Sequence, residues 1–342
     1  MRDFFIFSIM RKTFTKIGLL GALLILNSCN STKDPAGENV IISENKTVNL
    51  LSEVEVSETS VKEKMEYLAS DELEGRETGT EGIEKAATYI EDFFSQNNIK
   101  PYFQNFRDSF QVSGKTGFNI VGVLEGNDPQ LKDEFIILGA HYDHIGIQDP
   151  IGNDSIANGA NDNAAGTVAV MELAKALSEA GENKRSIIFA LFSAEELGLE
   201  GAKHLSKKLK SQNLDIYSMV NFEMIGIPMK GKDFQAYVTG YERSNLAEKF
   251  NEYLGAKILG FLPQAKEYNL FQRSDNYPFF QEFQIPAQTI SSFDFTNYEY
   301  YHHVSDSAEN MNYVFMADLI ENVIPAIQTM ANTSEKEIKL NN

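Results

Sequence analysis

Several acidic residues and histidines lie just after stretches that predict buried strands. They are His141, Asp143, Glu195, Glu196 and Glu223, with Asp162 in a glycine-rich turn before a predicted helix and His302 in a later loop. In open α/β sheets, ligands bind outside the carboxyl ends of the strands, so we expect these side chains to converge there. Imidazole and carboxylate groups together suit zinc, cobalt or manganese. The sequence therefore predicts a metal site assembled from residues far apart in the chain.

Two features of this set favour hydrolytic chemistry. A carboxylate shared by two cations can hold them ~3.5–4 Å apart, the separation found in two-metal hydrolases. The adjacent pair Glu195 and Glu196 can divide two tasks, because consecutive residues leaving a strand point in different directions. One side chain can bind a metal while the other handles the proton of a metal-bound water.

The elements that must position these residues alternate between strands and helices. We expect strands at residues 103–112, 118–124, 134–139, 185–192, 217–222, 234–239 and 286–291, and helices at 81–94, 197–209, 245–254 and 311–327. Residues 185–192 form a continuous apolar run flanked by charge, which is typical of a central strand buried on both faces. The alternation after residue 134 predicts an α/β fold, a three-layer α/β/α sandwich around a mostly parallel mixed sheet.

Seven short motifs contain these residues. They are LASDELEGRETGTEG (68–82), GAHYDHIG (139–146), NGANDNAAG (158–166), SAEELGLEGA (193–202), VNFEMIG (220–226), RSDNYPF (273–279) and YYHHVSDS (300–307). In these motifs and in their order, the chain resembles the M28 metallopeptidases, a family that includes bacterial two-zinc aminopeptidases. The resemblance implies a zinc-peptidase fold. It also implies an aminopeptidase that hydrolyses the N-terminal bond of peptides with a water bridged by two zinc ions.

The resemblance assigns the metal ligands residue by residue. It implies that His141 and Glu223 complete one metal site, that Glu196 and His302 complete the other, and that Asp162 bridges the two ions. The expected cofactors are two Zn²⁺ ions, with cobalt or manganese as alternatives. The family's usual residue in place of Glu223 is Asp. Because Glu is one methylene longer, its strand end or its carboxylate must be placed differently.

The remaining site residues also follow from the resemblance. Glu195 is expected to be the general base, and Asp143 to orient His141 through the second ring nitrogen. Tyr301 either only packs as an aromatic side chain or donates a hydrogen bond to the oxyanion. The bond joining residues 162 and 163 is expected to be a cis peptide.

Two further histidines flank the expected ligands. His302 is preferred to His303 as the ligand, because only His302 has the family's His-x-x-x-Asp spacing, to Asp306. His144 is expected to be a loop residue or to lie behind the ligands.

Two other functions are compatible with this resemblance. Glutaminyl cyclases resemble the same family but use one zinc ion for an intramolecular acyl transfer. A non-catalytic peptide-binding relative would be expected to lose ligands or the base. All five ligand positions and Glu195 are filled here, which favours a hydrolase.

The N-terminal segment predicts export and a lipid anchor. A basic cluster at residues 11–16 precedes the apolar run 17–26, which is shorter than the ~20 residues needed to cross a bilayer. This order fits a secretory signal. The sequence LNSC at 26–29 resembles a bacterial lipobox, and Cys29 is the only cysteine. We therefore expect Cys29 to be lipidated; a plain signal peptide is the alternative.

These observations divide the chain into four segments. We expect a lipoprotein signal peptide (1–28), a flexible tether (29–56), an M28-type peptidase catalytic domain (57–334) and a polar tail (335–342). The expected location is the bacterial cell envelope, on the periplasmic or cell-surface side.

The charge of the chain limits its partners. Lys and Arg total 30 against 49 Asp and Glu, so the net charge is −19. A nucleic acid would be repelled, and a basic membrane-binding surface is disfavoured. We expect peptide substrates, contact with the membrane only through the lipid anchor, and a monomer.

Overall fold

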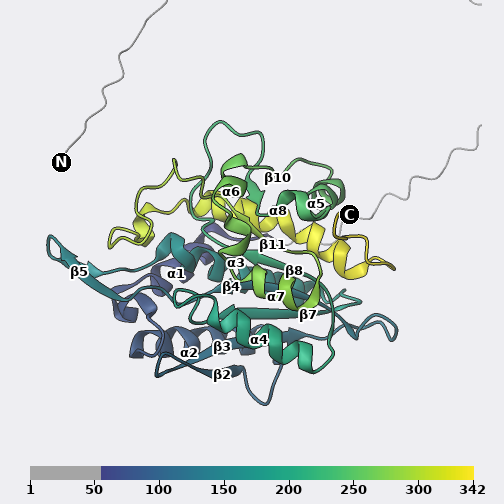
Figure 1. Ribbon diagram of the computed structural model, residues 1–342, viewed down its shortest axis with the longest axis horizontal. Helices are drawn as coiled ribbons and strands as arrows, with labels where there is room; N and C mark the ends of the chain where they lie inside the picture. The colour runs from purple at the N-terminus through teal and green to yellow at the C-terminus, as the bar shows by residue number, and fades with distance from the viewer. Residues whose placement is uncertain (1–54) are drawn as a thin grey trace, which may run out of the picture. The chain divides into compact units, whose positions relative to one another are not determined.

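A nine-stranded mixed sheet lies at the centre of the computed structural model, which describes residues 55–342 (Figure 1). The predictions for the signal peptide, Cys29 and nearly all of the tether lie outside these residues. The strands of the sheet are β1 (Lys100–Pro101), β2 (Arg107–Val112), β3 (Lys115–Leu124), β4 (Glu134–His141), β7 (Ser186–Phe192), β8 (Asp215–Phe222), β9 (Ala236–Val238), β10 (Leu259–Gly260) and β11 (Ala287–Ser291). Their order is β1-β3-β7-β4-β8-β11-β9-β10, and β2 also pairs with β3.

The four central strands β7, β4, β8 and β11 are parallel. The hairpin of β2 and β3 adds antiparallel strands on one side, and β9 runs antiparallel to β11 on the other. His141 pairs with Phe192 in register, so β4 and β7 end at the same level. This register brings the end of β4 beside the loop that carries the glutamate pair.

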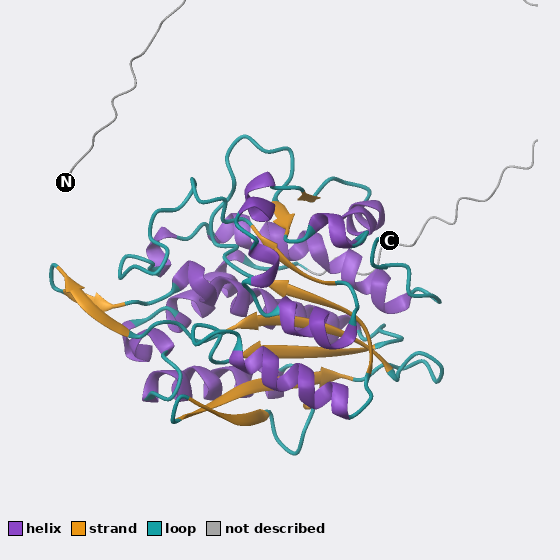
Figure 2. Cartoon of the chain, in the orientation of Figure 1, coloured by secondary structure: helices purple, strands orange, loops and turns teal. Residues whose placement is uncertain are grey.

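Helices cover both faces of the sheet (Figure 2). The α-helices are α1 (Glu58–Leu68), α2 (Glu81–Gln96), α3 (Ala165–Ala180), α4 (Glu200–Ser211), α5 (Leu246–Leu254), α6 (Pro263–Glu267), α7 (Asn276–Phe283) and α8 (Tyr313–Asn332). Short helical turns are η1 (Asp71–Arg76), η2 (Ala160–Ala164), η3 (Tyr241–Arg243), η4 (Leu270–Gln272) and η5 (Ala308–Asn310).

Side chains that alternate along each central strand form two hydrophobic cores. In β4, Ile136 and Leu138 pack into the core that contains α2, α3 and α8, whereas Ile137 packs into the core that contains α4 and α7. Both faces of the strand are therefore buried, which is why its sequence is almost continuously apolar. The predicted three-layer α/β/α sandwich is confirmed.

The structure differs from the predicted elements at several boundaries. The helix expected from residue 197 begins at Glu200, because Ala194 and Leu199 adopt positive φ angles of 58° and 62° and close a tight turn. A hairpin of β5 (Ile147–Ile151) and β6 (Asp154–Ile156), which was not predicted, projects from the body (Figure 1). The segment 335–342 lies against the domain, with Ile338 buried. Within residues 55–342, no helix is both long and apolar enough to cross a membrane.

Candidate active site

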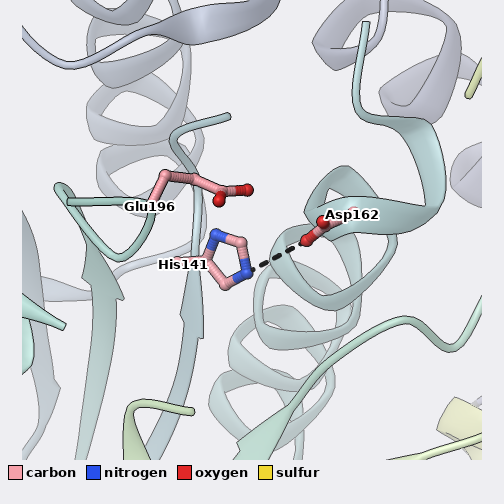
Figure 3. Close-up of side chains that lie close together, drawn as sticks. All are labelled: His141, Asp162 and Glu196. Carbon is pink, nitrogen blue, oxygen red and sulfur yellow. Dashed lines mark ion pairs between the residues drawn. The ribbon is translucent and has the colours of Figure 1, made fainter. Parts of the chain in front are cut away.

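Three side chains that could hold a metal ion meet at the carboxyl edge of the central strands. His141 is the last residue of β4, Glu196 lies in the loop after β7, and Asp162 lies in η2 just before α3. One ligand atom from each lies within 4.8 Å of the others (Figure 3). The predicted convergence of these residues is what the structure shows.

The carboxylate of Asp162 lies between two imidazoles. Its Oδ1 atom is 3.4 Å from His141 Nε2, and its Oδ2 atom is 3.2 Å from His302 Nε2. The side chain is almost completely buried. A carboxylate that bridges two metals presents one oxygen to each, so this arrangement fits the bridging role expected for Asp162.

The second imidazole also contacts Glu196. His302 Nε2 lies 3.2 Å from Glu196 Oε2, and the backbone of His302 has a positive φ of 53°. This uncommon conformation for a non-glycine residue belongs to a turn. The structure therefore places His302, and not His303, beside the other candidate ligands.

Asp306 holds the loop that carries Asp162. Its Oδ2 accepts a hydrogen bond from the main-chain N–H of Asp162 at 3.0 Å, and its Oδ1 accepts one from Asn161 at 2.8 Å. Tyr298 donates its hydroxyl to the same Oδ1 at 2.7 Å. The peptide bond between Asp162 and Asn163 is cis, as predicted. The loops of Asp162 and His302 are thus tied to each other.

Asp143 holds the glutamate pair through the main chain. Its carboxylate accepts hydrogen bonds from the N–H groups of Glu195 at 3.1 Å and Glu196 at 3.4 Å, and from the Thr78 hydroxyl at 3.3 Å. His141 Nδ1 faces the main-chain oxygen of Asp143 at 3.2 Å, whereas its carboxylate Oδ1 is 3.7 Å away. Asp143 therefore lies beside His141 as expected, but its main chain makes the closer contact.

Glu223 is the expected ligand that directly follows β8. Its main-chain N–H donates to Ile290 O at 3.1 Å, while its Oε2 atom is buried without a hydrogen-bond partner among the described residues. A buried carboxylate oxygen without a partner costs free energy, which a bound cation would recover. Burial raises the pKa of Glu223 to about 7. Its chemistry fits a metal ligand, although it lies outside the group of three described above.

The site separates its ionisable groups into two kinds. Burial alone would raise the pKa of Asp162, but hydrogen bonds from His141 and His302 hold it well below the usual value. Hydrogen bonds to Asp162 and Glu196 raise the pKa of His302 to about 10. Burial, with further acids nearby, raises the pKa of Glu195 well above that of an exposed glutamate. Asp162 thus keeps the negative charge that a bridging ligand needs, and Glu195 is a buried carboxylate that could accept a proton.

Arg76, in the motif at residues 68–82, has a structural role here that was not predicted. Arg76 is fully buried, and its guanidinium donates to the main-chain oxygens of Tyr142 at 2.8 Å, Asn158 at 2.7 Å and Gly159 at 2.9 Å, and to that of Leu68. It therefore joins the segments that carry His141 and Asp162. Its place in the motif 68–82 was the only available signal.

Two more residues of the motifs are buried near the expected ligands: Asp275, which was not predicted, and His144, which was expected in a loop or behind the ligands. Asp275 is fully buried, and neither of its carboxylate oxygens has a hydrogen-bond partner among the described residues. His144 is buried as well, and its Nδ1 lies 3.1 Å from Glu196 Oε1. Both lie in motifs quoted above, but only the folded chain brings them to the site.

A cavity that opens to solvent adjoins Glu223. Aromatic rings form part of its wall: Tyr301 stacks on His302 with ring centroids 4.0 Å apart and on Phe293 at 5.8 Å. Tyr301 is 48% exposed. The other lining residues are Met224, Tyr237, Thr239, Leu270, Arg273, Ser274, Thr289, Ser291 and Phe295. Tyr301 thus connects a candidate ligand to the space where a substrate side chain could lie.

The sequence profile of peptidase family M28 matches residues 119–327. This chain belongs to peptidase family M28. The matched range contains every expected metal ligand. The similarity to the family therefore extends beyond the short motifs to most of the expected catalytic domain. The M28 fold, its hydrolase class and its dependence on zinc are consistent with a site built from imidazoles and carboxylates.

By their names, individual relatives of this M28 chain include leucine aminopeptidases and zinc metalloproteases. It is 31% identical over 179 residues to leupeptin-inactivating enzyme 1 of Streptomyces exfoliatus, which covers 52% of this chain and 36% of that protein. It is 31% identical over 156 residues to a probable leucine aminopeptidase of Arthroderma otae, covering 44% and 38%. The aligned segments thus span little more than a third of each relative.

Solved structures show the same fold at low sequence identity. The zinc aminopeptidase BSAP of Bacillus subtilis matches with a TM-score of 0.63 at 16% identity, over 82% of this chain and 97% of that one. The glutaminyl cyclase of Porphyromonas gingivalis matches with a TM-score of 0.64 at 15% identity, over 80% and 99%. Both chemistries therefore occur on this fold, and only the site can distinguish them.

Proposed function

We propose that this M28 peptidase is an aminopeptidase that uses two zinc ions to hydrolyse the N-terminal bond of peptides. The observation that carries the proposal is the division of the Asp162 carboxylate between two imidazoles, with Oδ1 facing His141 and Oδ2 facing His302. A one-metal site would need only one of these contacts. Glu223 would complete the first site and Glu196 the second.

When bound, the two zinc ions would acidify a shared water and polarise the scissile carbonyl. Glu195 would accept the proton of that water and pass it to the leaving amine. Its main-chain N–H is fixed by Asp143, so the base is held by a group other than a metal ligand. Cobalt or manganese could occupy the same ligands.

The cavity beside Glu223 would receive the side chain of the first residue of the substrate. Its aromatic wall suits apolar side chains, and Tyr301 at its edge could donate its hydroxyl to the oxyanion. The acidic residues around the site favour a positively charged α-amino group. A free N-terminus is therefore the feature by which this site would recognise its substrates.

The test compares a free and a blocked N-terminus. Purified protein loaded with zinc should hydrolyse leucine p-nitroanilide but not N-acetyl-leucine p-nitroanilide, chelation should abolish the activity, and zinc or cobalt should restore it. Cyclisation of an N-terminal glutamine without hydrolysis would instead assign the protein to the cyclase chemistry. Neither reaction in the zinc-loaded protein would favour a peptide-binding relative.

We also propose that the chain is a lipoprotein of the bacterial cell envelope, anchored through Cys29. The support is the order of the basic cluster, the apolar run and LNSC at residues 26–29. The acidic catalytic domain would then remain in solvent and meet peptides on the periplasmic or cell-surface side.

A further inference from the structure

We propose that His144 is a positioning residue of the second metal site, which holds the carboxylate of Glu196 so that one oxygen faces His302. The inference rests on the two-metal function proposed above. It concerns a buried imidazole that the expected ligand set leaves without a role.

The two oxygens of Glu196 are divided between two imidazoles. Oε1 lies 3.1 Å from His144 Nδ1, and Oε2 lies 3.2 Å from His302 Nε2. An ionised carboxylate only accepts hydrogen bonds, so the Nδ1–H group of His144 is the donor. This bond occupies Oε1 and leaves Oε2 directed at the position between His302 and Asp162.

The ring of His144 is held in place from several sides. Its main-chain N–H donates to Arg76 O at 3.3 Å, and its ring lies edge-on to that of His302 with centroids 5.7 Å apart. A Cβ atom on Gly159 would lie 2.5 Å from the His144 Cγ atom, and Gly159 has a φ of +58°. Glycine at 159 therefore leaves the space that the ring fills. A donor fixed in this way can fix the carboxylate that it bonds.

The second ring nitrogen argues against direct ligation by His144. Metal-binding histidines almost always donate their other ring N–H to an acceptor. His144 Nε2 is buried and has no hydrogen-bond partner among the described residues. In addition, Nδ1 is 3.9 Å from Asp162 Oδ2, further than His302 Nε2 at 3.2 Å. Both observations favour a donor to Glu196 over a further ligand.

The experiment measures binding of Zn²⁺ alone by competition with a chromophoric chelator, which yields a dissociation constant for each ion. His144→Phe keeps a ring in the space and removes the donor, and His144→Asn removes the ring. We expect both variants to raise the dissociation constant of one of the two ions by ~10–100-fold and to leave that of the other unchanged. The matched control is His204→Asn, because His204 lies in α4 and pairs with Asp108 away from the site. It should bind both ions as the unmodified protein does.

A double variant tests whether His144 acts through Glu196. In a Glu196→Asp background, which keeps a carboxylate but withdraws it from His144 by one methylene, His144→Phe should cause little further loss, because the bond that it would remove is already broken. An equal additional loss in that background would overturn the proposal and indicate a direct ligand. Unchanged binding of both ions by folded His144→Phe would overturn it as well. Failure of the unmodified protein to bind a second ion would instead contradict the two-metal function.

Discussion

Replacing Glu195 by Gln separates the base from the metal ligands. The substitution keeps the size and shape of the side chain but removes its ability to accept a proton. A positioned general base contributes ~10²–10⁴-fold to the rate. We therefore expect kcat to fall ~10²–10⁴-fold, a loss of about 3–5.5 kcal/mol of transition-state stabilisation.

Metal binding should survive this substitution. The main-chain N–H of Glu195 donates to Asp143, and that bond does not depend on the side chain. The atoms that could hold an ion belong to His141, Asp162 and Glu196. Glu196→Gln should therefore show the opposite result, a loss of metal, since the amide is a poor replacement for a ligating carboxylate.

The assay combines initial-rate kinetics with the metal content per chain, measured by mass spectrometry on the same samples. Glu200→Gln is the matched control, because Glu200 lies a few residues away in α4 and pairs with Lys203 at the surface. It should change neither kcat nor metal content. Loss of metal in Glu195→Gln with retention in Glu196→Gln would refute the assignment of the pair.

Four further predictions concern the bridging ligand, a buried arginine, a buried glutamate and the lipid anchor. Asp162→Ala should lose both ions, and retention of both on dialysis would remove Asp162 from the bridging position. Arg76→Lys should lower the free energy of unfolding in urea by about 2–4 kcal/mol, because an ammonium has three donors for four buried carbonyls; a change below about 0.5 kcal/mol would contradict this. In the metal-free protein, burial raises the pKa of Glu223 to about 7, above its usual 4.5, so the folded state binds this proton more tightly. That stabilisation is complete below about pH 4.5 and is lost as the pH rises through about 7. In Glu223→Gln, the free energy of unfolding in urea should depend less on pH over this range, and an unchanged pH dependence would contradict the shift. Cys29→Ser should move the protein from the membrane to the soluble fraction, and a processed variant that stays membrane-bound would contradict lipidation.

The sequence predicts the fold well where burial dictates the pattern. The central strands are apolar on both faces, so β4, β7 and β8 could be located from composition alone. The strand ends then indicated which acids and histidines would meet. The hairpin of β5 and β6 could not be predicted, since its exposed residues lack the alternation of a half-buried strand.

The supporting residues of the site were harder to predict than the expected ligands. Arg76 bonds only to main-chain oxygens, which leave no trace in the sequence of their own segments. The orientation of Asp143 depends on how the loop after β7 turns, and that turn uses positive φ at residues that are not glycine. Such contacts depend on the three-dimensional path of the backbone and have no periodic pattern.

The most direct test of the two-metal proposal is anomalous diffraction at the zinc edge from crystals of the zinc-loaded protein. We predict two peaks about 3.5–4 Å apart on either side of the Asp162 carboxylate, one beside His141 and Glu223 and the other beside Glu196 and His302. A single peak beside Glu196 and His302, or two peaks that do not share Asp162, would contradict it.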